Sequence, residues 1–309
     1  MKIAVIGMGG IGGYFGGKLA KAYVPSGTHE VYFVARGEHL AEIRENGLIV
    51  KADDGNFTAY PTLATDRPAG IGKVDLVLFC VKSYDFEEAA RQMEEIIGEQ
   101  TYILPLQNGV NKRGWMERVL GKGVSLDGCV YMAVHIESPG VIRQAGVSRK
   151  LIFGREPQDV PRLKPLAELF LGAGIDAELA EDISLPVWNK YVLICSLAAA
   201  TSYYRETVGD ILGDPVKKTF LEGLVGEVEQ VARKKGIPYP PDIFETTMRI
   251  ISMFPRDTKT SMQRDFEQGK RTELEIFSGA VVRMGREVGM DTPLHRKVYE
   301  ASRAGIRGR

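Results

Sequence analysis

The first 36 residues carry the feature that most restricts the fold: a glycine-rich turn between an apolar run and a helix-compatible segment. Residues Lys2–Ile6 are typical of a buried strand, and residues 14–22 favour a helix. The turn between them consists of Gly7, Met8, Gly9, Gly10, Ile11 and Gly12. In such a unit the glycines permit a tight turn, close approach of a pyrophosphate and close packing of the helix. The pattern predicts a dinucleotide-binding turn; the alternative is a turn without a ligand.

The second apolar run, residues 31–36, ends on a cation. Arg36 stands where enzymes that use NAD usually carry Asp or Glu for the ribose hydroxyls. Because a guanidinium pairs well with a phosphate, Arg36 predicts NADPH/NADP as the cofactor through its 2′-phosphate. The alternative is that Arg36 is a solvated strand end.

Composition narrows the class of protein. A chain of 309 residues with 44% apolar content is long enough for two cores. Lys plus Arg equals Asp plus Glu at 40 each, so no bulk charge favours nucleic acid or a membrane surface. A small-molecule partner is therefore expected.

The cysteines and the apolar runs bear on the compartment. Cys80, Cys129 and Cys195 lie far apart, which predicts neither a disulfide framework nor a metal site. The start of the chain lacks a signal-peptide pattern, and no uncharged apolar run is long enough to span a bilayer. We expect a cytoplasmic protein without membrane contact.

Strand-like and helical segments alternate in the first half of the chain. Residues 73–81 and 101–106 read as strands, and the charge-rich residues 85–97 between them read as a helix. Shorter strands over 124–135 and 140–154 precede an amphipathic helix over 159–171. This order predicts an α/β fold with a doubly wound parallel sheet of Rossmann type, spanning residues 1–183.

The spacing of apolar residues changes from a strand pattern to a helix pattern near residue 184. Four runs read as helices with few strand signals: residues 185–204, 215–236, 242–253 and 258–289. The sequence thus predicts a second, all-helical domain over residues 184–309.

Polar side chains follow two of the predicted strands. Lys82 comes directly after the run that ends at Val81, and Asn108 follows the run that ends at Leu106. Ligands of open α/β sheets lie outside the carboxyl ends of the strands, so both residues are candidates for contact with the cofactor or a substrate carboxylate. The alternatives are an ordinary turn at Asn108 and a solvated lysine at Lys82.

Lys190 is the single residue that most clearly indicates a catalytic role. It is the only charged side chain in residues 185–200. We expect it to face a cleft, where burial would lower its pKa toward the range useful for proton transfer. An ammonium beside a ketone can donate a proton as hydride arrives. The alternative is a lysine that extends its charged end from a domain boundary into water.

The segment that begins at Ser261 and continues to Glu273 is ambiguous from its pattern. Alone, it reads as a helix start followed by a solvated acidic face.

Taken together, the motifs resemble the ketopantoate reductase (2-dehydropantoate 2-reductase) family over essentially the whole chain. The resemblance rests on the order of Gly7-x-Gly9-x-x-Gly12-x-x-x-Gly16, Val81-Lys82, Gln107-Asn108-Gly109-Val110, Trp188-x-Lys190, Ser261-Met262-x-x-Asp265, Arg271-Thr272-Glu273 and Gly289-Met290-x-Thr292-Pro293. It implies a Rossmann domain joined to a helical domain like that of 6-phosphogluconate dehydrogenase.

The resemblance also implies residue roles. Arg36 would hold the 2′-phosphate, and Lys82 and Asn108 would line the crevice for cofactor and substrate. Lys190 would donate the proton to the ketone. Ser261 and Glu273 would hold the two ends of the substrate or orient Lys190, which makes Glu273 a second catalytic candidate.

One departure from the family concerns the substrate. The family usually carries asparagines four and eight residues after the catalytic lysine, but this chain has Ile194 and Ala198. Thr201, or Ser196 on a nearby face, could supply a replacement polar group. The alternative is a related, more apolar 2-keto acid as the substrate.

The functional hypothesis is NADPH-dependent reduction of 2-dehydropantoate to pantoate, in pantothenate biosynthesis, without a metal. The rivals are a reductase of another, more apolar 2-keto acid and a non-catalytic NADPH-binding sensor. Relatives in the family include dimers, so a homodimer is compatible with the resemblance.

Overall fold

The computed structural model describes residues 1–307 and divides them into two compact units. The first contains residues 1–107 and 111–183, and the second contains residues 108–110 and those from Ser184 onward. The segment 108–110, which lies between the two stretches of the first unit in sequence, is therefore part of the second unit.

The first unit is built on a six-stranded parallel sheet. Its order is β5 (Leu63–Thr65), β2 (Glu30–Val34), β1 (Lys2–Ile6), β6 (Leu76–Phe79), β7 (Tyr102–Pro105) and β8 (Val124–Ser125). The chain runs outward from β1 in one direction and then crosses over to β6, so the strand order reverses between β1 and β6. In doubly wound sheets ligands bind at such a switch point, outside the carboxyl ends of the strands.

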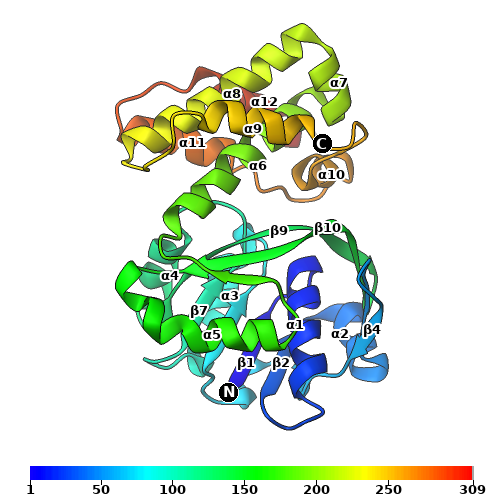
Figure 1. Cartoon of the computed structure of the whole chain (residues 1–309). Coiled ribbons are helices and arrows are strands. Elements are labelled where there is room, and N and C mark those ends of the chain that lie inside the picture. Colours follow the sequence, from blue (N-terminus) through cyan, green and yellow to red (C-terminus); the bar gives the residue numbers. More distant parts are fainter. Residues whose placement is uncertain (308–309) are drawn as a thin grey trace. The chain divides into compact units, whose positions relative to one another are not determined.

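Helices cover both faces of this sheet, which is why its strands are apolar nearly throughout. They are α1 (Gly10–Tyr23), α2 (Gly37–Asn46), α3 (Phe86–Met93), α4 (Lys112–Leu120) and α5 (Val160–Gly172), with short 3₁₀ turns η1 (Pro68–Ile71), η2 (Ser83–Asp85), η3 (Glu94–Ile96) and η4 (Pro157–Asp159). Figure 1 shows α1 and α5 against one side of the strands.

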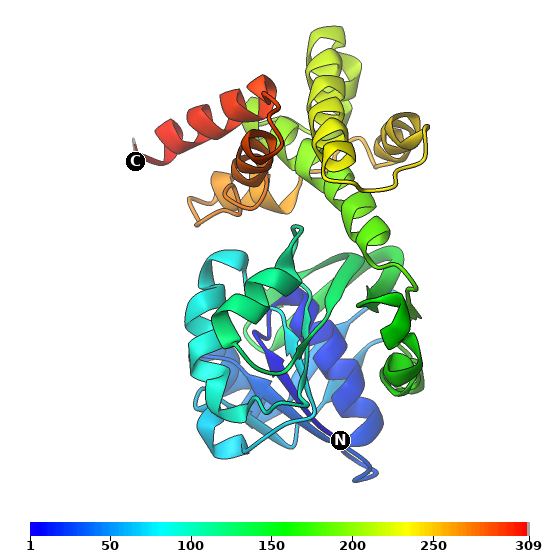
Figure 2. The ribbon, with the colours of Figure 1, turned by 90° about the vertical axis from the view of Figure 1, so that its left-hand side faces the viewer.

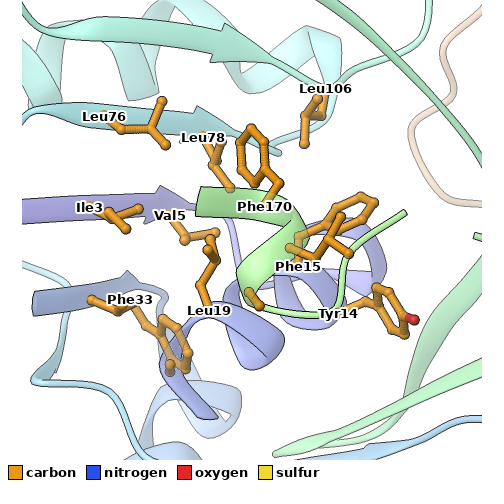
Figure 3. Packing of buried hydrophobic residues seen from close by; sticks show 14 of the residues in the cluster. Ile3, Val5, Tyr14, Phe15, Leu19, Phe33, Leu76, Leu78, Leu106 and Phe170 are labelled. Carbon is orange, nitrogen blue, oxygen red and sulfur yellow. The ribbon is translucent and has the colours of Figure 1, made fainter. Parts of the chain in front are cut away.

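The side chains of β1 alternate between two hydrophobic clusters, one on each face of the sheet. Ile3 and Val5 point to one face, where they pack with Leu19 of α1 and Phe170 of α5 (Figure 3). Ala4 and Ile6 belong to a separate cluster with residues of α3 and α4. Because successive strand side chains point to opposite faces, one strand supplies both layers.

A second, mixed sheet is the main departure from the predicted strands. Its order is β11 (Ala177–Leu179), β10 (Val141–Gly154), β3 (Leu48–Lys51) and β4 (Phe57–Ala59), with β9 (Asp127–Ser138) antiparallel to β10. The strands predicted over 124–135 and 140–154 are present as β8, β9 and β10, but β9 and β10 are longer than expected and pair as a hairpin. The strands β3, β4 and β5 were missed because each has only three or four residues.

The second unit is helical over its described residues. Its elements are α6 (Ser184–Tyr204), α7 (Val208–Gly213), α8 (Pro215–Lys234), α9 (Ile243–Ser252), α10 (Ser261–Glu267), α11 (Ser278–Glu287) and α12 (Pro293–Arg307), seen from a second side in Figure 2. The helix α6 is apolar around most of its surface because it packs against α7, α8, α9, α10 and α12. The predicted fold class, a parallel α/β sheet followed by an all-helical unit, is confirmed.

The predicted continuous helix over 258–289 was wrong. The chain leaves α10 at Glu267 and re-enters a helix only at Ser278. Gly269 ends the first helix in a left-handed conformation with φ of +66°. The irregular stretch from 268 to 277, called here the Glu273 loop, carries one of the candidate site residues.

Within residues 1–307, no helix combines the length and apolar content that crossing a membrane requires.

Candidate active site

The turn between β1 and α1 has the geometry that its glycines predict. Gly7 has a φ of +88°, and a Cβ there would lie 2.8 Å from a methyl group of Val81. A Cβ at Gly12 would lie 2.1 Å from the carbonyl oxygen of Gly7, so only glycine lets α1 approach the end of β1 this closely. The turn is therefore fixed by close packing of the first helix against the sheet.

This turn also suits an anion. The N-cap residue of α1 is Gly9, which has no side chain to cap the N–H groups of the helix. The first turn of α1 contains no acidic residue. A Cβ at Gly9 would meet no atom within 4 Å, so one side of the turn is open. Because the first N–H groups of a helix have no intrahelical acceptor, they are available to a phosphate. The residues present thus fit a dinucleotide.

Met8 and Ile11 differ from the glycines around them. The side chain of Met8 is buried in the core of the first unit, and Ile11 packs against the same core. The side chain of Met8 is therefore used in packing, whereas that of Ile11 remains partly exposed.

Arg36 lies beyond the end of β2, immediately before α2. Its side chain is 78% exposed, and its Nη2 lies 3.5 Å from Oδ2 of Asp85. Sequence reasoning missed Asp85, which ends η2 after strand β6. Its position after a predicted strand could have indicated it. The strands β2 and β6 both lie next to β1, and the carboxyl ends of parallel strands lie at one edge of the sheet.

Lys82 lies at the carboxyl end of β6 and is partly buried. Its carbonyl oxygen accepts the backbone N–H of Asp85 at 3.0 Å, which closes η2. The structure thus places Lys82 and Asp85 on one short turn at the switch point of the sheet.

In the second unit, three predicted site residues come together. The Lys190 ammonium donates to Oδ1 of Asn108 at 2.9 Å. Nδ2 of Asn108 in turn donates to Oε2 of Glu273 at 3.4 Å. The side chain of Glu273 is buried, and those of Lys190 and Asn108 are partly buried. One amide therefore links a cation to a carboxylate.

Three different segments supply these side chains. Lys190 lies near the start of α6, Asn108 lies in the 108–110 segment, and Glu273 lies in the Glu273 loop. A Cβ at Gly109 would lie 3.6 Å from Ile276, so the 108–110 segment packs against the same loop. The group exists only because the fold brings these segments together.

Tyr191 ties the Glu273 loop to α6. Its buried hydroxyl donates to the carbonyl oxygens of Ile276 at 2.9 Å and Phe277 at 3.2 Å. The N–H of Ile276 donates to the carbonyl of Glu273 at 3.1 Å, which makes a turn between them. Burial raises the pKa of Tyr191 well above its usual value, so its hydroxyl stays protonated. Tyr191 thus holds the loop that carries Glu273. The Glu273 carboxylate is linked to Lys190 through the amide of Asn108.

The remaining substrate-binding candidates are placed differently. Ser261 is exposed at the first position of α10. Thr201 is fully buried, and its hydroxyl lies 2.8 Å from that of Thr260, the N-cap of α10. This geometry gives Thr201 a structural partner and does not support its use as a substrate ligand.

The face of α6 that follows Lys190 is apolar. Ile194 is partly buried and packs against the helical core, and Ala198 is buried within that core. Ser196, the other replacement considered, is also fully buried.

The group can act as an acid–base pair. An ammonium held by an amide can donate a proton to an oxygen, and the carboxylate can accept hydrogen bonds or stabilise the positive charge. Within residues 1–307, no cluster of three or more His, Cys, Asp or Glu side chains is placed to hold a metal ion.

Two family models match the chain. The model described as ketopantoate reductase PanE/ApbA matches residues 3–158, and the model described as its C-terminal part matches residues 182–305. Among similar proteins, the uncharacterized oxidoreductase YkpB of Bacillus subtilis (strain 168) is 27% identical over 300 residues, covering 97% of each chain.

Solved structures show the same relationship. A PanE/ApbA family ketopantoate reductase from Ralstonia eutropha JMP134 has a TM-score of 0.90 at 28% identity, covering 100% of this chain and 99% of that chain. The 2-dehydropantoate 2-reductase from Porphyromonas gingivalis W83 has a TM-score of 0.82 at 34% identity, covering 97% and 98%.

The first unit has a parallel sheet with a glycine turn of the dinucleotide-binding type, and the helical unit carries a linked lysine, amide and carboxylate. Together with the family match, these features define an oxidoreductase of two units. The chain belongs to the ketopantoate reductase family, which confirms the predicted resemblance. Membership implies a nicotinamide dinucleotide as the cofactor.

Proposed function

We propose that this protein reduces the keto group of 2-dehydropantoate to give pantoate, with NADPH as the reductant, in the biosynthesis of pantothenate. The observation that carries the proposal is the linked group of Lys190, Asn108 and Glu273. It gives the helical unit a proton donor whose ammonium is already oriented. The family relationship supports the same reaction class.

The cofactor would be held by the first unit. The turn over residues 7–12 would take the pyrophosphate, Arg36 the 2′-phosphate, and Lys82 would contact the cofactor or the substrate. When bound, NADPH supplies the hydride that reduces the keto carbon. The proposal requires that the nicotinamide carried by this unit reach a substrate held at Lys190.

The protein's own part in the chemistry is proton transfer and orientation. Lys190 Nζ would donate its proton to the ketone oxygen as negative charge develops there. Asn108 Oδ1 holds that ammonium, and Glu273 would bind the substrate's hydroxyl end while fixing the amide of Asn108. Ser261 would bind the substrate carboxylate.

A second candidate substrate, a more apolar 2-keto acid, is favoured by one observation. Ile194 and Ala198 give the α6 face beyond Lys190 no hydrogen-bonding side chain. Each hydrogen bond that a substrate hydroxyl fails to make there costs about 0.5 to 1.5 kcal/mol.

A steady-state assay of the purified protein separates these alternatives. The loss of NADPH absorbance is followed with ketopantoate and with a panel of 2-keto acids that lack its hydroxyl group. A kcat/KM highest for ketopantoate supports the first substrate, and a preference for the hydroxyl-free acids supports the second. NADPH binding without turnover of any keto acid would contradict both and favour a non-catalytic sensor.

A further inference from the structure

The site proposed for the ribose phosphate contains a carboxylate as well as a guanidinium. Arg36 Nη2 and Asp85 Oδ2 are 3.5 Å apart, and their side chains are 78% and 33% exposed. They come from segments that follow different strands, β2 and β6, of the same sheet. Both charges are therefore accessible to a ligand bound along this edge.

The two groups recognise different forms of the nucleotide. A guanidinium binds a phosphate through several N–H donors in a planar fork. A carboxylate accepts the hydrogen bonds of free ribose hydroxyls, which is its usual role in sites that bind NAD. This edge of the sheet thus carries a side chain suited to each form of the nucleotide, although the carboxylate follows β6 and not β2.

We propose that Asp85 makes this a dual-cofactor site, in which its carboxylate accepts the ribose 2′-hydroxyl of NADH and weakens the binding of NADPH. The proposal rests on the role of Arg36 in the proposed function. It assigns to Asp85 the balance between the two cofactors.

The direction of the effect follows from charge. A phosphate that binds Arg36 comes within several ångströms of the Asp85 carboxylate, and like charges at that range repel. NADH carries no 2′-phosphate, so it avoids this repulsion and gains the carboxylate as an acceptor. The ion pair itself holds Arg36 only weakly, because exposed pairs contribute little and are screened by salt.

Asp85 can be replaced without removing a helix cap. It is the N-cap residue of α3, but its side chain makes no capping hydrogen bond. Asp85→Asn keeps the size of the side chain and removes the charge. Asp85→Ser is the second variant, so that a folding defect in one leaves the other for measurement.

The experiment is calorimetric titration of the purified full-length protein with NADPH and NADH, without a keto acid. The wild type is compared with Asp85→Asn, Asp85→Ser, Arg36→Gln and the control Glu88→Gln. The control removes the same charge from the next turn, where the Glu88 carboxylate accepts a hydrogen bond from Gln92. Thermal melts establish that each variant is folded.

The selectivity ratio, Kd for NADH divided by Kd for NADPH, decides the outcome. We expect Asp85→Asn and Asp85→Ser to raise this ratio at least about fivefold, and Glu88→Gln to leave it unchanged. Part of the change should come from tighter NADPH binding, and this part should shrink as salt is added. An unchanged or lowered ratio in the Asp85 variants would overturn the proposal, since the carboxylate would then be neutral or would help Arg36.

Arg36→Gln separates this result from the proposed function. If it lowers the ratio while the Asp85 variants do not raise it, the role of Asp85 fails and that of Arg36 stands. If Arg36→Gln leaves the ratio unchanged, the 2′-phosphate assignment fails, and the dual-cofactor proposal fails with it.

Discussion

The ammonium of Lys190 donates a hydrogen bond to the amide oxygen of Asn108, a residue 82 positions earlier in the chain, at 2.9 Å. Asn108 follows strand β7 of the parallel sheet in sequence, yet its segment belongs to the compact helical unit. Both partners of this hydrogen bond therefore lie in the helical unit, although they are far apart in sequence. The same amide contacts Glu273, so its orientation is fixed from both ends.

Lys190→Ala should lower kcat for the preferred keto acid by about 10² to 10⁴, because it removes the proposed proton donor. NADPH affinity, measured by titration without a keto acid, should change little. Lys218→Ala, which removes an exposed lysine from α8, is the control for loss of charge. An unchanged kcat in Lys190→Ala would remove this lysine from the mechanism.

Glu273→Gln should lower kcat/KM by about tenfold or more, because the charged partner of the Asn108 amide is lost. A rise in KM alone would indicate that Glu273 binds substrate, whereas a fall in kcat would indicate that it orients Lys190. The matched control is Glu275→Gln, two residues further on, whose exposed carboxylate pairs with Arg283. Equal kinetics for wild type and Glu273→Gln would contradict both roles.

Tyr191→Phe should lower kcat several-fold, because the Glu273 loop loses the hydroxyl that holds its carbonyls to α6. Tyr239→Phe is the control, since Tyr239 donates a comparable bond at 2.6 Å to the carbonyl of Trp188 in the same unit. Each variant should lose about 1 kcal/mol of stability in denaturant titrations. The positioning role of Tyr191 requires that its variant lose clearly more turnover; equal kcat values in the two variants would exclude that role.

His295 should make the protein less stable in acid. Burial lowers its folded-state pKa from 6.5 to about 4, so the unfolded chain binds the proton more readily. Stability from this residue is complete above pH 6.5 and falls by about 3 kcal/mol as the pH drops toward 4.

The measurement for His295 is denaturant unfolding between pH 4 and 7 in wild type and His295→Gln. Burial raises the pKa of nearby Glu227, which acts in the opposite direction and is present in both proteins. The difference between the two curves therefore isolates His295. Parallel curves across this range would show that the imidazole does not account for the acid sensitivity.

Ile194→Asn should shift substrate preference toward ketopantoate, because an amide at this partly buried position would then be available to a substrate hydroxyl. We expect the ratio of kcat/KM for ketopantoate to that for a hydroxyl-free 2-keto acid to rise about tenfold. Ile194→Leu tests whether repacking alone has this effect. A ratio unchanged in the Asn variant would mean that the substrate's hydroxyl lies elsewhere.

Local sequence predicted the elements whose pattern is continuous. The first strand, the glycine turn and α6 follow from adjacent residues, because burial periodicity and backbone sterics act over one or two turns. The prediction of one helix over 258–289 was wrong. It was made because residues that favour a helix continue through the stretch where the chain leaves α10. The observed break contains Gly269 and the loop held by Tyr191, a contact that no local pattern encodes.

For the site, the sequence by itself determined the glycine-rich turn, the isolated lysine at position 190 and the cation at position 36. Which side chains meet these residues was decided only by the tertiary structure. Asn108 reaches Lys190 and Asp85 reaches Arg36 because distant segments pack together, and a spacing rule within one helix or strand cannot contain that information. Parallel strands gather the turns that follow them at one edge, so separation along the chain says little about separation in space.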